Sequence, residues 1–164
     1  MLIAHLPAGY LLARVARQRF AAPGMAAALI GSVLPDFDMV YFCMTGGKVH
    51  HHDYISHWPL FWLALAGAVL PAIRPLAPRW FPTAVVFFAA VMLHMVMDTV
   101  AAPVLWLAPF DWTKIELATV PATHSNWVVS FMLHWTFGLE LLICAAAVFV
   151  AVRGNRRGRG MQQA

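Results

Sequence analysis

With 164 residues, of which 62% are hydrophobic and 11% charged, the chain is short enough for one domain and too apolar for an average soluble protein. The composition therefore predicts an all-α, polytopic membrane protein. The net charge of +4 comes from basic residues at loops and at the C-terminus. They do not form the basic stripe with interleaved aromatic residues that is typical of nucleic-acid-binding proteins, so we expect no nucleic-acid partner.

Five hydrophobic segments approach or exceed the length of about 20 residues that a helix needs to cross a bilayer. They run over residues 2–15, 25–42, 58–73, 80–100 and 127–152. The first segment is short, and the second is interrupted at Pro35, where the helix should break or end. We predict one membrane-embedded helical bundle over residues 1–152 and a basic, disordered cytoplasmic tail over residues 153–164.

The arginines predict the orientation of these segments. They fall after the first segment, between the third and fourth, and after the fifth. By the positive-inside rule these ends are cytoplasmic, so the N-terminus is expected outside and the C-terminus in the cytoplasm. This topology gathers every histidine, and the aspartates with them, at the outer face. Because the arginines alone assign the topology, this gathering is an independent sign of a metal site.

The stretch from His94 to Asp98 lies near the end of the fourth segment. Residues four apart share one face of a helix, so the imidazole and the carboxylate can point at one ion or one substrate atom. Ionisable side chains within a membrane helix usually face a bundle interior or a water-filled cavity and indicate function. The alternative is a hydrogen bond between helices.

Two further groups of ligand-type residues are expected at the same face. Asp36 and Asp38 follow Pro35 at a helix end and place two carboxylates close together, although an ordinary interfacial loop can also begin in this way. In the loop over residues 50–57, we favour His52 and His57 as ligands, with His50 and His51 as outer neighbours. The alternative is a solvated histidine-rich loop that binds metal only loosely.

Other candidates carry less weight. His5 joins the set only because it lies on the predicted outer side, and His134 fits a hydrogen-bonded core residue better than a ligand. The methionines of the fourth segment are ordinary apolar filler. With oxygen ligands beside histidines, we expect zinc, with manganese or iron as alternatives.

The ordered motifs resemble a known family. They are His5-x-x-x-Gly9, Gly31-Ser-x-Leu-Pro35-Asp36-x-Asp38, His52-x-x-x-x-His57, His94-x-x-x-Asp98 and Pro109-Phe110. This set, over roughly residues 1–112, resembles the YdjM-like family of inner-membrane-associated proteins, which are regarded as metal-dependent hydrolases. The resemblance implies a helical membrane protein and carries the ligand role to the matching histidines and aspartates. One departure is the loop, where the family typically has His-Arg-Gly and this chain has His52-Asp53-Tyr54, which removes an arginine suited to an anionic group. The His-x-x-x-Asp helix alone is more distantly similar to zinc-dependent phospholipase C enzymes and related nucleases.

The sequence thus predicts an inner-membrane hydrolase with a mononuclear or dinuclear metal site at the outer, periplasmic face. The expected ligands are His5, Asp36, Asp38, His52, His57, His94 and Asp98. Of these, Asp36, Asp38 or Asp98 would bridge ions or accept a proton from a metal-activated water. A site at the lipid boundary suggests membrane lipid as a partner and a lipid or phosphoester substrate, with the phosphoester preferred by analogy. A metal carrier or sensor with the same ligands, and a structural membrane protein that needs none of them, are the alternatives.

Overall fold

The computed structural model describes residues 1, 3–16, 24–46 and 51–161, with side chains described as far as Gly154. Its α-helices are α1 (His5–Ala16), α2 (Gly24–Val33), α3 (Asp38–Met44), α4 (Pro59–Leu76), α5 (Phe81–Thr99), α6 (Trp127–Met132) and α7 (Trp135–Met161). Short 3-10 turns are η1 (Pro35–Phe37), η2 (His51–Asp53), η3 (Ile55–His57) and η4 (Pro78–Trp80). The described residues form no strand, and the only bridge among them pairs Val104 with Ile115. The all-α prediction is confirmed.

Not all of the five predicted hydrophobic segments are long enough to cross a membrane as helices. Within the described part of the chain, three helical segments are long and apolar enough to cross a membrane: α4, α5 together with η4, and α7 up to Gly154. A fourth is possible only if α2 and the η1–α3 segment, bent by 46° at their junction, count as one broken span. The 12 residues of α1 cover about 18 Å, against a hydrocarbon core of about 30 Å. Pro35 explains the break after α2, because a proline donates no backbone hydrogen bond to the preceding turn.

The last hydrophobic segment also differs from the prediction. It consists of two helices, α6 and α7, separated at Leu133 and His134. Helix α7 continues through Met161, so residues 153–161 of the predicted disordered tail are helical, whereas residues 162–164 lie outside the described part. Arginine is a good helix former, and extending an existing helix is much less costly than starting one.

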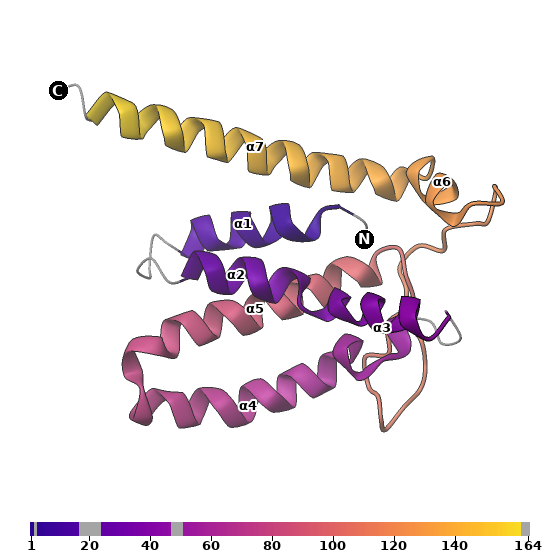
Figure 1. The fold of residues 1–164 in the computed structure, drawn as a ribbon, viewed down its shortest axis with the longest axis horizontal. Helices are drawn as coiled ribbons and strands as arrows, with labels where there is room; N and C mark the ends of the chain where they lie inside the picture. Colours follow the sequence, from indigo (N-terminus) through magenta and orange to yellow (C-terminus); the bar gives the residue numbers. More distant parts are fainter. Residues whose placement is uncertain (2, 17–23, 47–50, 162–164) are drawn as a thin grey trace.

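Helices α1, α2 and α5 form the centre of the bundle, with α4 against α5 on one side and α7 against α1 on the other (Figure 1). Two glycines, Gly9 of α1 and Gly31 of α2, allow α1 and α5 to approach α2 closely. A Cβ added at Gly9 would lie 2.9 Å from the carbonyl oxygen of Ala28, and one added at Gly31 would lie 2.6 Å from that of Phe87. The backbone of α2 therefore lies directly against both neighbours, which brings the ends of α1, α2 and α5 together.

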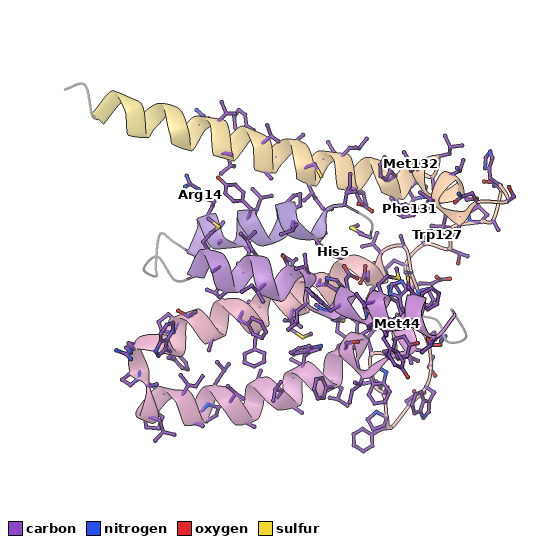
Figure 2. The ribbon with its side chains drawn as sticks, viewed as in Figure 1. His5, Arg14, Met44, Trp127, Phe131 and Met132 are labelled. Atoms are coloured by element: carbon purple, nitrogen blue, oxygen red, sulfur yellow. The ribbon has the colours of Figure 1, made fainter. Side chains whose placement is uncertain are left out.

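The two ends of the bundle differ in chemistry. The start of α1, the end of α2 and the end of α5 lie at one end, where the histidines and aspartates gather. Arg14 lies at the other end of α1, far from His5 (Figure 2), and the turn between α4 and α5, with Arg74 and Arg79, lies at that end too. The predicted separation of histidines from arginines is thus present in the fold, while its orientation in the membrane stays a prediction.

Candidate metal centre

Asp98, on the last turn of α5, lies at the centre of the cluster and is almost fully buried. Its Oδ2 atom is 2.9 Å from Nε2 of His94, 3.7 Å from Nε2 of His57 and 3.8 Å from Nε2 of His52. Its Oδ1 atom is 3.1 Å from Nε2 of His5. One carboxylate therefore joins ligand-type side chains from α1, η2, η3 and α5.

The orientation of His94 is set by a helix end. Its Nδ1 atom lies 2.8 Å from the carbonyl oxygen of Ser32, in the last turn of α2. Because a carbonyl only accepts hydrogen bonds, Nδ1 carries the proton, and in the neutral ring Nε2 presents a lone pair. That lone pair faces Asp98 Oδ2, a buried oxygen with no hydrogen-bond partner. The Met1 ammonium pairs with the other oxygen of Asp98, Oδ1, and a divalent ion at Oδ2 would satisfy both facing acceptors.

His57 is oriented in the same way by a carboxylate. Its Nδ1 atom lies 2.5 Å from Oδ2 of Asp38, which also accepts a hydrogen bond from Ser56 Oγ at 2.5 Å. The Nε2 atom of His57 is thereby turned toward Asp98. Pairing of a carboxylate with the outer nitrogen of a histidine is typical of metal ligands, because it fixes the tautomer and raises the basicity of the ring. Asp38 therefore contacts the outer nitrogen of His57, and its role as a direct ligand stays a prediction.

The charge of His57 reflects its two neighbouring carboxylates. Burial lowers the pKa of His57, but the interactions with the Asp36 and Asp38 carboxylates outweigh burial and raise the pKa to about 9. The ring is therefore protonated near neutral pH, and a metal ion at Nε2 would have to displace that proton.

The four inward atoms have the spacing of a metal site. Asp36 Oδ1 lies 3.6 Å from Nε2 of both His57 and His94, and the two Nε2 atoms are 3.4 Å apart. With the two contacts of Asp98 Oδ2 to these rings, the separations run from 2.9 to 3.7 Å. Ligands about 2.0–2.1 Å from one tetrahedral ion are about 3.3–3.4 Å apart. Both the donor types and their spacing fit one divalent ion.

Two groups of residues meet the wider geometric condition for metal binding, with ligand atoms within 4.8 Å of one another. The first contains His5, Asp36, His94 and Asp98, and the second contains His51, His52 and His57. Six of the seven predicted site residues thus belong to these two groups, and the seventh, Asp38, contacts His57. His51 lies closer to it than the sequence suggested, and His50 lies outside the described residues.

Other predicted elements lie apart from the cluster. His134 is half-buried and its Nδ1 lies 2.9 Å from Thr136 Oγ1, so it is hydrogen-bonded as predicted but does not lie in the core, and neither metal-binding group includes it. Asp53, which stands where the family typically has arginine, pairs with Lys114 at 2.6 Å. This ion pair joins the connection between α5 and α6 to η2, which contains His51 and His52.

Glu140 of α7 was not predicted to take part in the site. Its fully buried carboxylate accepts hydrogen bonds from the backbone nitrogens of Ile3 at 2.5 Å and Ala4 at 3.1 Å, just before His5 begins α1. These amides lie where a helix has no internal acceptors, and a carboxylate there also interacts favourably with the helix dipole. Its isolation within an apolar segment was the signal that could have identified it as a positioning residue.

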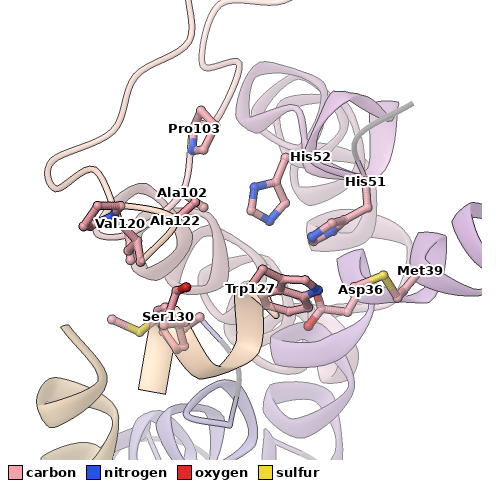
Figure 3. A pocket seen from close by; sticks show the side chains of 14 residues that line it. Asp36, Met39, His51, His52, Ala102, Pro103, Val120, Ala122, Trp127 and Ser130 are labelled. Atoms are coloured by element: carbon pink, nitrogen blue, oxygen red, sulfur yellow. The ribbon is translucent and has the colours of Figure 1, made fainter. Parts of the chain in front are cut away.

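A cavity of about 460 Å³ opens beside the cluster (Figure 3). Asp36, His51 and His52 form the wall that it shares with the site. The other walls come from the connection after α5 and from Trp127, Ser130 and Phe131 of α6. The side chain of Asp36 is 37% exposed, unlike that of Asp98 at 1%, so Asp36 is the carboxylate that meets the contents of the cavity.

Comparison with known proteins places the chain in a family. A family model described as YdjM inner membrane protein matches residues 1–159. No curated protein and no solved structure matches the chain.

Proposed function

Since the chain belongs to the YdjM inner membrane protein family, and its buried histidines and aspartates are spaced for a divalent ion, we propose that it is a membrane-bound, metal-dependent hydrolase. The proposed substrate is a lipid or another phosphoester reached at the outer, periplasmic face. Zinc is the proposed metal, because nitrogen and oxygen donors at these separations suit it, with manganese or iron as alternatives.

The observation that carries this proposal is the convergence of two carboxylates and two imidazoles. Five separations among Oδ1 of Asp36, Oδ2 of Asp98 and the Nε2 atoms of His57 and His94 run from 2.9 to 3.7 Å. Ser32 and Asp38 hold the outer nitrogens of the two rings, so both Nε2 atoms face these carboxylates. The Met1 ammonium pairs with Oδ1 of Asp98, which leaves Oδ2 facing the rings.

The residues have distinct parts in the proposed reaction. His57, His94, Asp36 and Asp98 would hold the ion, with His5 and His52 as further ligands to a second ion. A bound divalent ion supplies a Lewis acid for a phosphoryl oxygen and lowers the pKa of water. Asp36 is placed to accept a proton, because it alone of the four is substantially exposed to the cavity. Asp38 would keep His57 in the productive tautomer.

The test begins with metal content. Wild-type protein, purified in detergent, is compared by elemental analysis with the double variant His94→Ala/Asp98→Ala and with His134→Ala, a matched control for a histidine outside the cluster. We expect about one or two ions per chain in the wild type and in the control, and none in the double variant. Equal and negligible metal in all three, after reconstitution with zinc, manganese and iron, would overturn the proposal.

The metal-loaded protein is then assayed with phospholipids and with soluble phosphoesters. Hydrolysis that the double variant lacks and the control retains would support the enzyme. Metal bound at the predicted ligands without hydrolysis of any of these substrates would instead favour the carrier or sensor class.

A further inference from the structure

The cavity beside Asp36 has one polar wall and several apolar ones. Alanine, proline and valine side chains from residues 101–122 line it together with Trp127 and Phe131. Its volume lies within the range of about 300–1,000 Å³ that is typical of small-molecule sites. A ligand in this space therefore exposes apolar atoms to most of the walls, while one end lies at the metal cluster.

The charges of the lining narrow the ligand further. Among the described residues that line the cavity there is no lysine or arginine. Lys114, on the same connection, is paired with Asp53. Asp36 adds a negative charge to the polar wall. The N-terminal ammonium of Met1, which also lines the cavity, is paired with Asp98. A ligand with several phosphates, such as a nucleotide, would therefore find no lysine or arginine along these walls to pair with its charges.

The position of the cavity suggests how the ligand enters. Trp127 lines the cavity and is 62% exposed, and the neighbouring Met132 and Leu133 are also exposed. Met44, at the end of α3, is 80% exposed. Exposed aromatic and aliphatic side chains of this kind suit the level where a bilayer meets water. An amphiphile held at that level would present its chain to the cavity without leaving an apolar environment.

From this arrangement we propose that the cavity binds the apolar chain of a phosphoester amphiphile, with the phosphate at the metal cluster. The inference rests on the proposed function. It adds that the apolar chain of the ligand, and not a charged headgroup, determines which phosphoester binds. The residues after α5 and those of α6 would thus select the substrate, while the residues of η1, η3 and α5 hold the reacting end.

The test measures binding and not turnover. Metal-loaded protein in lipid nanodiscs is titrated calorimetrically with methyl, butyl and hexyl phosphate, and empty nanodiscs give the background. Each methylene that leaves water for an apolar site strengthens binding by about fourfold, so even partial entry predicts at least about tenfold tighter binding of hexyl than of methyl phosphate. Ala122→Phe and Ala102→Phe, which fill the cavity, should remove this difference, whereas Ala64→Phe on the exposed surface of α4 should preserve it.

The three phosphates separate this inference from the proposed function. Binding of methyl phosphate that requires the metal reports the cluster alone, and the added affinity of hexyl phosphate reports the cavity. Equal affinities of the three phosphates would overturn the cavity and leave the phosphoester function standing. A chain-length effect that both cavity-filling variants retain, while their metal content stays at the wild-type level, would also overturn it. If methyl phosphate fails to bind the metal-loaded protein, phosphoester recognition fails, and this inference fails with it.

Discussion

Gly31→Ala tests whether the contact between α2 and α5 sets the metal site. The added Cβ would lie 2.6 Å from the carbonyl oxygen of Phe87 and 3.1 Å from Cβ of Ala90, so the two helices must separate by about 0.4 Å to reach 3.0 Å. Overpacking of this kind costs about 1–3 kcal/mol of unfolding free energy. The next residue is Ser32, whose carbonyl oxygen lies 2.8 Å from Nδ1 of His94. The same shift of about 0.4 Å would lengthen this hydrogen bond to about 3.2 Å, the upper limit of good hydrogen-bond geometry.

We therefore expect Gly31→Ala to lose both stability and metal affinity. Loosening the partner of a ligating histidine typically weakens metal binding by about 10- to 100-fold. The assay is a competition titration with a chelator, combined with thermal unfolding in the same detergent. Gly67→Ala is the matched control, since nothing lies within 4 Å of a Cβ added there on α4. If Gly31→Ala matched the wild type in both measurements, the helix contact would not position His94, and the reasoning from Gly31 to the site would be refuted.

Three other predictions concern the residues around the ligands. Because the pKa of His57 is raised to about 9 without metal, protonation of His57 stabilises the fold fully below about pH 6.5, and this stabilisation disappears as the pH rises through 9. Metal affinity should change in the opposite sense and rise about tenfold per pH unit up to pH 9, because the metal replaces the proton. A metal affinity that is independent of pH from 7 to 9 would contradict this prediction. Asp38→Asn should weaken metal binding by about 10- to 100-fold with little change in helix content by circular dichroism, and an unchanged affinity would show that Asp38 does not orient His57. Glu140→Gln should lower the unfolding free energy by about 2 kcal/mol and weaken metal binding through His5, while Cys144→Ala one turn away should change neither. In a His5→Ala background Glu140→Gln should not weaken metal binding further, and an additional loss there would argue against positioning through His5.

The parts of the site that the sequence predicted are those that depend on local spacing. His94 and Asp98 face the same way because one helical turn separates them, and Asp36 follows Pro35 at a helix end in both the sequence and the structure. The gathering of the histidines at one end of the bundle, away from the arginines, is also present in the structure. It depends only on the alternating direction of successive segments. Each of these features can be read without knowing how the helices pack.

The parts that it did not predict depend on packing between distant elements. Asp38 follows Asp36 by two residues, yet its Oδ2 atom contacts Nδ1 of His57, 19 residues away, which local spacing does not indicate. Glu140 contacts the start of α1 across 136 residues of chain. Composition also does not distinguish the spanning segments from the others, because an apolar segment can be buried in lipid or in protein. Helices α1 and α2 are short and pack on α5.

The central position of Asp98 also bears on how the protein is made. Its partners include His5, near the start of the chain, and His57, so no complete ligand set exists until α5 has been synthesised and inserted. A chain with α5 misplaced would have the histidines but no shared carboxylate, and it would hold an ion weakly or not at all. Capture of the ion would therefore follow correct insertion of the first five helices. Loading with metal would also give the cell a means of telling finished chains from misassembled ones, because an ion bound only by the native state stabilises that state against unfolding and proteolysis.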